Sequence, residues 1–215
     1  MTTTVWLLLA LALLAAMIDW WSVATDRLGV EFLAKPAVII CLIGVALAIH
    51  TAPGGATDVE RGILIAALGA SLVGDVVLMT PDARFEAGLA AFLLAHILYL
   101  FAFVPDVSAI PTLLAAMVAI GFGFAVVPRL LAAVRPHGRP LTVAVALYIV
   151  AVSAMGVSAA GTGVMVAAIG GMLFMISDSL LGWDRFVGPV QGGRVAVHVT
   201  YHLGQMGLVT WLAAS

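Results

Sequence analysis

Two aspartates inside apolar segments are the residues of this chain that point most directly to chemistry. Asp75 and Asp178 each lie within about two helical turns of the end of an apolar segment. A carboxylate inside a bilayer is costly unless it faces a protein interior or a wet cavity, so each is a candidate functional group. We predict that the two face each other across one cavity, with structural pairing to Lys35 or to tyrosine hydroxyls as the alternative. Asp19, beside Trp20, is either a further site residue or a carboxylate solvated at head-group level.

Polar side chains also form a stripe on each of two apolar segments. One stripe has the spacing i, i+3, i+4, i+7 and the other i, i+4, i+7, so each stripe lies on one helix face. Their members are His198, Tyr201, His202 and Gln205 on the last segment, and Phe92, His96 and Tyr99 on an earlier one. Such stripes need a polar lining, which predicts a cavity opening to the cytoplasm or the inner leaflet. Interhelical hydrogen bonding is the alternative for the histidines.

Composition determines the kind of protein that must position these side chains. Of 215 residues, 64% are hydrophobic and 9% are charged, against about 25% charged in soluble domains, so the chain is an integral membrane protein. The 9 basic residues nearly balance the 11 acidic ones, which gives no indication of a nucleic-acid partner. The single cysteine, Cys41, excludes an intramolecular disulfide and a cysteine-based metal cluster, and its apolar neighbours predict a packing role.

The apolar segments predict an all-α, polytopic bundle of eight transmembrane helices that forms a single domain over residues 1–215. No alternation typical of a membrane β-barrel occurs. The predicted spans are Thr4–Trp21, Phe32–Ile49, Gly62–Thr80, Ala87–Val104, Ile110–Val127, Leu141–Val157, Val164–Leu181 and Val195–Ala213. Because no lysine or arginine precedes the first segment, we expect a retained span and not a cleaved signal peptide.

Basic residues fall almost wholly on one side of this eight-helix layout. The connections after the first, third, fifth and seventh spans contain Arg27, Lys35, Arg84, Arg129, Arg135, Arg139, Arg185 and Arg194. Arg61 lies on the other side. The positive-inside rule therefore predicts that these connections are cytoplasmic and that both termini face outward. The composition, rich in alanine, valine and glycine, is typical of bacterial proteins, which predicts a bacterial inner (plasma) membrane.

Short matches between the two halves of the chain predict an internal repeat of four plus four helices. Four features recur in order at offsets between 101 and 104 residues. They pair Lys35-Pro36 with Arg139-Pro140, Gly74-Asp75 with Ser177-Asp178, Arg84-Phe85 with Arg185-Phe186, and His96 and Tyr99 with His198 and Tyr201. With an even number of helices in each half, residues 1–106 and 107–215, the repeat would be parallel and related by an axis along the membrane normal.

The chain resembles the YhhN-like, lysoplasmalogenase family of small eight-helix membrane proteins over almost its whole length. The matching residues are Lys35-Pro36, Gly74-Asp75, Leu78-Met79, Phe85, Gly88, Phe92, His96, Tyr99, Ser177-Asp178, Asp184-Arg185-Phe186, Tyr201 and Gln205. The resemblance implies hydrolysis of the vinyl ether bond of lysoplasmalogens, which releases a long-chain aldehyde and a glycerophospho-ethanolamine or glycerophospho-choline. The expected partners are then a lysophospholipid substrate and the bilayer. The oligomeric state stays open, and so does the physiological lysolipid, because many bacteria make no plasmalogens.

Two carboxyl groups suit this reaction. Protonating the alkene carbon of a vinyl ether gives an oxocarbenium ion, which water captures. Burial raises the pKa of a carboxyl group and neighbouring carboxyls titrate apart, so one pair can supply both an acid and a carboxylate. We therefore expect Asp75 and Asp178 to be catalytic, with either as the acid, and no cofactor. The residues expected to bind substrate or orient the carboxylates are Lys35, His96, Tyr99, Ser177, Tyr201, His202 and Gln205.

Three other interpretations stay open. Zinc held by some of His96, His198 and His202 together with an aspartate would make the protein a metal-dependent lipid hydrolase. A transporter is suggested by the repeat and the buried charges, although the outward halves of the predicted spans contain no ionisable residue. A triad of Ser177, His202 and Asp178 lacks the strained turn of a nucleophile elbow.

Overall fold

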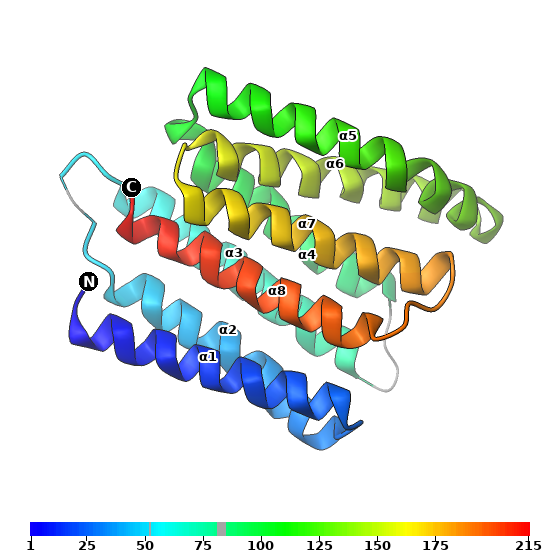
Figure 1. Ribbon diagram of the computed structural model, residues 1–215, viewed down its shortest axis with the longest axis horizontal. Helices are drawn as coiled ribbons and strands as arrows, with labels where there is room; N and C mark the ends of the chain where they lie inside the picture. Colours follow the sequence, from blue (N-terminus) through cyan, green and yellow to red (C-terminus); the bar gives the residue numbers. More distant parts are fainter. Residues whose placement is uncertain (52, 81–84) are drawn as a thin grey trace.

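Eight α-helices make up the computed structural model, which describes residues 1–51, 53–80 and 85–215 (Figure 1). They are α1 (Thr3–Ala24), α2 (Leu28–Ala48), α3 (Asp58–Met79), α4 (Phe85–Phe103), α5 (Ala109–Val134), α6 (Arg139–Gly161), α7 (Met165–Phe186) and α8 (Gly193–Thr210). Short 3-10 turns follow α4, α5 and α8: η1 (Val104–Asp106), η2 (Arg135–His137) and η3 (Trp211–Ala213). All eight predicted segments are confirmed as helices, and the described ranges contain no strand.

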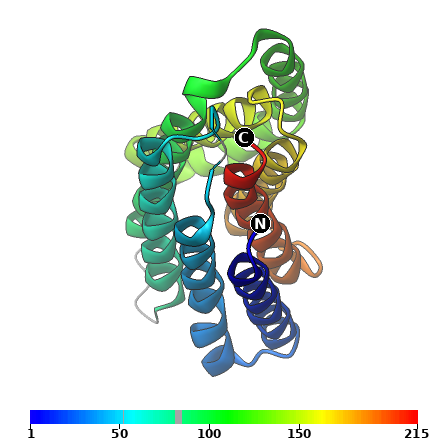
Figure 2. The same ribbon diagram turned by 90° about the vertical axis from the view of Figure 1, so that its left-hand side faces the viewer.

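The helices run up and down through one bundle. The connections α1–α2, α3–α4, α5–α6 and α7–α8 all lie at one end, which is termed the connection end. Both termini lie at the other end (Figure 1). Apart from α4 and α5, helices adjacent in sequence pack on each other, while α8 also contacts α1 and α2, and α4 contacts α6 (Figure 2). α8 is therefore central, and its polar face meets helices from both halves of the chain.

Seven of the eight helices, α1 to α7, are long and apolar enough to cross a membrane. α8 falls short because its polar face lowers its mean hydropathy, yet it packs lengthwise between α7 and α1 (Figure 1). α5 is the most peripheral helix, with Leu130 and Val134 as its buried residues. An apolar helix exposed along its length is stable in lipid and not in water, so the chain is an integral membrane protein.

α2 begins one turn earlier than the sequence predicts. Pro36 lies inside the helix and not at its start. The charge pattern assigns Lys35 to the connection between the first two spans, but this residue extends from the third turn of α2 and is buried. Pro36 removes one backbone donor and its ring crowds the carbonyl of Phe32, and the helix continues through it because neighbouring helices stabilise the segment.

Small residues allow α7 and α8 to approach at backbone distance. A Cβ atom on Gly170 would lie 2.8 Å from the carbonyl oxygen of Gly204, and one on Gly207 would lie 2.7 Å from the Cα of Gly170. No larger residue fits at these positions without moving a helix backbone, which is typical of membrane helix interfaces. The glycines of this segment therefore have a packing role.

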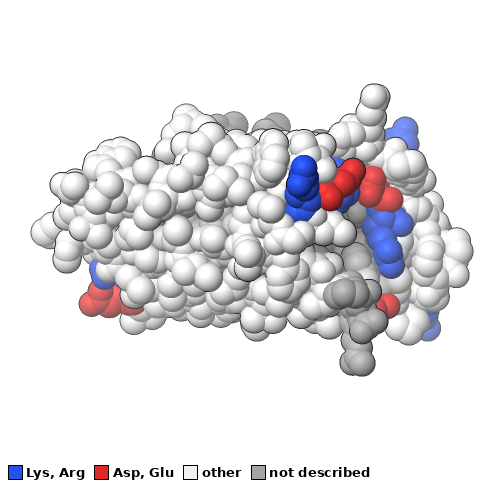
Figure 3. Space-filling model, turned by 90° about the horizontal axis from the view of Figure 1, so that it is seen from below, with Lys and Arg blue, Asp and Glu red and all other residues white. Residues whose placement is uncertain are grey.

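Charged side chains gather at the connection end of the bundle (Figure 3). The basic residues described there are Arg27, Lys35, Arg129, Arg135, Arg139, Arg185 and Arg194. Arg61 lies in the first turn of α3 at the opposite end, where it pairs with Asp58 at 3.1 Å. Arg84, expected at the connection end, lies outside the described residues. The charge asymmetry thus follows the helix arrangement, while the side that faces the cytoplasm and the internal repeat stay predictions.

Candidate active site

A polar cavity of about 590 Å³ lies at the connection end of the bundle, between α2, α3, α7 and α8. It is lined by five of the residues expected in a site: Lys35, Asp75, Ser177, Asp178 and Tyr201. Its wall also contains the charged or titratable residues Glu31, Asp184, Arg194 and His198. The two aspartates therefore border one cavity, although their helices, α3 and α7, are about a hundred residues apart in sequence.

Asp75 is held by partners from two other helices. Its Oδ1 lies 3.0 Å from Nζ of Lys35 on α2, and its Oδ2 accepts a hydrogen bond of 2.8 Å from the hydroxyl of Tyr201 on α8. The same Lys35 ammonium lies 5.5 Å from the centre of the Tyr201 ring. Asp75 is 0% exposed, whereas the Lys35 side chain is 10% exposed at the cavity wall. The alternative of structural pairing with Lys35 is thus present, and the pair still borders the cavity.

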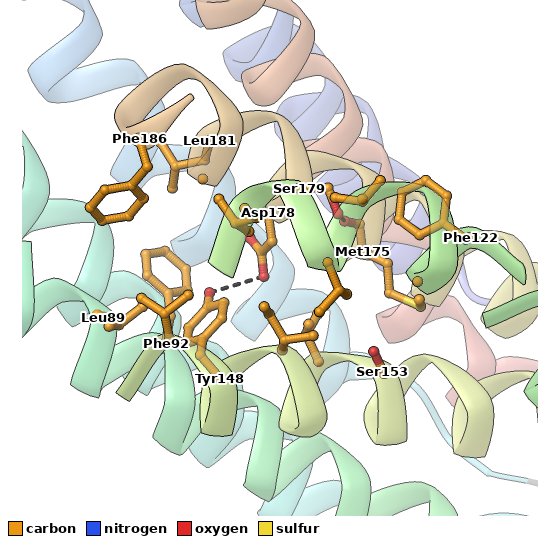
Figure 4. A pocket seen from close by; sticks show the side chains of 18 of the residues that line it. Leu89, Phe92, Phe122, Tyr148, Ser153, Met175, Asp178, Ser179, Leu181 and Phe186 are labelled. Carbon is orange, nitrogen blue, oxygen red and sulfur yellow. Dashed lines mark hydrogen bonds between the residues drawn. The ribbon is translucent and has the colours of Figure 1, made fainter. Parts of the chain in front are cut away.

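Asp178 has different neighbours. Its Oδ2 accepts a hydrogen bond of 2.9 Å from the hydroxyl of Tyr148 on α6, toward which its side chain points (Figure 4). Nε2 of His96 on α4 lies 3.2 Å from the same oxygen, with an alignment that falls short of a hydrogen bond. His96 is fully buried behind the carboxylate and packs edge-on against Tyr148 and Phe174. No lysine or arginine contacts Asp178 among the described residues.

Each aspartate is therefore contacted by the half of the chain to which it does not belong. Asp75 in residues 1–106 bonds Tyr201, and Asp178 in residues 107–215 meets His96. Tyr201 and His96 both come from the two polar stripes recognised in the sequence. The site forms only where all four of these elements, α3, α4, α7 and α8, meet.

A second set of titratable side chains leads from the cavity into the bundle. Nδ1 of His198 lies 2.7 Å from Oδ2 of Asp19, and its Nε2 faces Oε1 of Glu31 at 3.8 Å. Glu31 in turn pairs with Arg194 at 2.8 Å. Asp19 is fully buried, so the interpretation that it is solvated at head-group level is wrong, because its partner is a histidine on α8 and not water.

Besides His96, three of the residues expected in the site lie behind the cavity wall. The Tyr99 hydroxyl donates a hydrogen bond to Oε1 of Gln205, and both residues are fully buried between α4 and α8. His202 is likewise buried and accepts a hydrogen bond of 3.1 Å from the indole N–H of Trp20 at its Nδ1. These contacts match the interhelical bonding that was the alternative for the histidines. A contact of Tyr99, His202 or Gln205 with substrate stays a prediction.

The serine triad is not formed. Ser177 Oγ donates to the backbone carbonyl of Val197 at 3.0 Å, while His202 is bonded to Trp20. The histidines considered for zinc are also divided, because His96 faces Asp178 and His198 faces Asp19. Among the described residues, no group of three or more His, Cys, Asp or Glu side chains is arranged to hold a metal ion.

Sequence reasoning missed Glu31 and Tyr148 and treated Arg194 only as a topological charge. Glu31 lies four residues before Lys35 on α2, so the two share a helix face, a spacing that could have identified it. Tyr148 lies in an apolar segment that also contains the hydroxyl groups of Thr142 and Ser153, which offers no comparable pattern. Its place beside Asp178 depends on how α6 is rotated against α7.

Comparison with known proteins adds to this geometry. The sequence pattern of the YhhN family matches residues 30–212, from α2 to η3. The chain belongs to the YhhN family. Lysoplasmalogenase TMEM86B of Homo sapiens is 33% identical over 178 residues, which is 81% of this chain and 71% of that protein. A lysoplasmalogenase of Mycobacterium tuberculosis is 39% identical over 137 residues, which is 60% of this chain and 51% of that protein. No solved structure matches the chain.

The family match includes both aspartates, Lys35, Tyr201 and the missed residues Glu31, Tyr148 and Arg194. Asp19 precedes the matched range, although its partner His198 lies within it. Apart from Leu28 and Gly29, the cavity wall thus belongs to the part of the chain that matches the family, and the Asp19 contact is an addition from α1.

Proposed function

We propose that this protein is a membrane-embedded lysoplasmalogenase, which hydrolyses the vinyl ether bond of lysoplasmalogens to a fatty aldehyde and a glycerophospho-base. The observation that carries the proposal is the pair Asp75 and Asp178 on the wall of one cavity, in a chain of the YhhN family. The lysoplasmalogenases named above, one from Homo sapiens and one from Mycobacterium tuberculosis, support it.

The two carboxyl groups divide the steps of the reaction. Asp178 donates a proton to the alkene carbon remote from the ether oxygen, and the adjacent carbon becomes an oxocarbenium ion. Asp75, next to the Lys35 ammonium, acts as the carboxylate that stabilises this cation and accepts a proton from the attacking water. The resulting hemiacetal collapses: the glycerol oxygen takes the proton from Asp75, and the hemiacetal hydroxyl returns one to Asp178. One water is consumed, and both side chains regain their starting states.

The charges around the cavity suit a zwitterionic head group. Lys35 and Arg194 are the cationic side chains of the wall, and the Arg194 side chain is 48% exposed and paired with Glu31. Glu31 and Asp184 provide acidic positions for an ethanolamine or choline cation beside the phosphate. If Arg194 exchanges Glu31 for a phosphate oxygen of the substrate, its guanidinium has a charged partner both before and after the substrate binds.

The membrane orientation forms part of the proposal. In this proposal the connection end, and with it the cavity, lies on the cytoplasmic side of a bacterial inner membrane, with both termini outside; the basic residues at that end support this orientation. A lysophospholipid in the inner leaflet then has its head group at the depth of the cavity. Head-group recognition needs no exit of the lipid from the membrane.

Purified protein tests the proposal when it is offered a lysoplasmalogen and the matching ester lysolipid. Aldehyde release from the vinyl ether lipid is expected, with little or no fatty acid release from the ester. Asp178→Asn should abolish aldehyde release, since an amide cannot donate the proton, and the loss should reach about 10²–10⁴-fold. Release of fatty acid from the ester at a comparable rate, or full activity of the variant, would overturn the proposed reaction.

A further inference from the structure

A second, narrow cavity of about 70 Å³ lies on the other side of Asp178, between α4, α5, α6 and α7 (Figure 4). Its wall is apolar apart from Tyr148, Ser153, Asp178 and Ser179. The apolar side chains include Leu89, Phe122, Val127, Leu130, Val152 and Phe186. A channel this narrow and apolar excludes a charged head group and suits a single hydrocarbon chain.

The polar and the apolar cavities share part of their walls. Leu78, Phe92, Asp178 and Leu181 line both of them. Among these four residues, Asp178 is the one with an ionisable group, so its carboxyl group stands at the boundary between a charged space and an apolar space. Asp75 lines the polar cavity and does not line the apolar one.

A lysolipid is likewise divided into a charged part and an apolar part. Its charged head group is joined to an apolar chain through the ether-bearing carbons, and the bond to be hydrolysed lies at that junction. We propose that the narrow apolar cavity binds the hydrocarbon chain of the lysolipid, with the head group in the polar cavity and the reacting bond beside Asp178. This inference rests on the proposed function for the identity of the lipid. It also gives Asp178, and not Asp75, access to the alkene carbon that must be protonated.

The position of α5 adds support. This helix forms one wall of the apolar cavity through Phe122, Gly123 and Val127, while most of its other residues face outward. A chain in the cavity therefore lies one helix away from the surrounding lipid. The part of the hydrocarbon chain beyond the narrow cavity can extend along α5 without entering water.

Two glycines of α5 allow the cavity to be filled with a matched control. A Cβ atom on Gly123, which lines the cavity, would meet the Val127 side chain at 3.8 Å and nothing closer. A Cβ atom on Gly121 would have no neighbour within 4 Å, and this residue does not line the cavity. Gly123→Leu should therefore occupy the space without shifting the backbone, and Gly121→Leu makes the same change on the exposed face of the same helix.

The binding experiment uses a lysophospholipid with a saturated ether, which this reaction cannot cleave, and with a long chain that has a photoreactive group a few carbons from the ether, within the narrow cavity. Labelling of the wild-type protein should map to the lining segments of α5 and α6. Gly123→Leu should weaken binding of the long-chain probe by about tenfold, as expected when about two methylene groups lose their burial, and should affect a short-chain probe less. Gly121→Leu should leave both affinities unchanged.

Labels on α1, α2 or outward-facing residues in place of the lining segments would overturn the assignment of the cavity. So would equal effects of the two leucine variants. A protein that takes the label at the cavity but releases no aldehyde from a vinyl ether lipid would leave the chain site standing and refute the proposed reaction. Aldehyde release with labels elsewhere would leave the proposed reaction standing and refute the chain site.

Discussion

Replacing Asp75 with asparagine should damage both stability and activity, because the same carboxylate has a structural and a catalytic role. Asp75→Asn removes the negative charge 3.0 Å from the Lys35 ammonium, whose side chain is 10% exposed. Breaking a buried ion pair on one side costs about 3–5 kcal/mol, and access of water from the cavity to Lys35 places this pair near the lower value. A loss of about 3 kcal/mol in a chain of this size corresponds to a melting temperature lower by about 6–12 °C.

The assay is tryptophan fluorescence during heating of the purified protein, together with aldehyde release below the melting temperature. Lys35→Met combined with Asp75→Asn is the control, because it removes both charges and leaves no uncompensated ion. We expect the double variant to regain most of the lost thermal stability and to stay inactive. If Asp75→Asn melts like the wild type, the ion-pair reasoning is wrong. If the double variant hydrolyses lysoplasmalogen, Asp75 has no catalytic role.

Three further predictions concern proton placement, metal dependence and topology. Tyr148→Phe removes the hydroxyl that donates to Asp178 at 2.9 Å, so kcat should fall by about tenfold or more with folding preserved; an unchanged kcat would show that this hydrogen bond contributes nothing to catalysis. Chelators should leave the wild-type rate unchanged, whereas loss of activity that zinc restores would make the histidines ligands and remove the carboxylate mechanism. Reporter fusions after Gly138 and after Gly161 should report opposite sides of the membrane, and a cytoplasmic signal from Gly161 would reverse the assignment.

The sequence predicts much of this fold because its physical signals are strong and local. Twenty-residue apolar segments between polar connections identify each membrane helix, and the position of the charges marks one end of the bundle. The cost of a carboxylate in lipid likewise singles out Asp75 and Asp178 from their apolar surroundings in the sequence. Each of these inferences uses a property of one segment by itself.

Contacts between segments are harder to predict. The helical spacing places His198, Tyr201 and Gln205 on one face of α8, but the structure separates them by depth and partner. Tyr201 reaches Asp75 at the cavity wall, whereas Gln205 bonds Tyr99 behind it. Periodicity gives the face of a helix and not its rotation or height against neighbours, which is also why sequence reasoning misses Tyr148. Lys35 shows the same limit, since its position in the sequence does not reveal whether its partner is Asp75.

The position of α8 has a consequence for the order in which the protein is made. Asp75 and Asp19 enter the bilayer early in synthesis, yet their partners Tyr201 and His198 are translated 126 and 179 residues later. α8 is also the helix that lacks the apolarity of the other seven, so the hydrophobic driving force for its insertion into lipid is weak. Asp75 and Asp19 add to this driving force, because they bind Tyr201 and His198 on the polar face of α8 when this helix enters the bundle. Biogenesis and the proposed catalysis therefore share the Asp75 side chain, and a chain truncated before α8 would leave Asp19 without His198 and Asp75 with Lys35 alone.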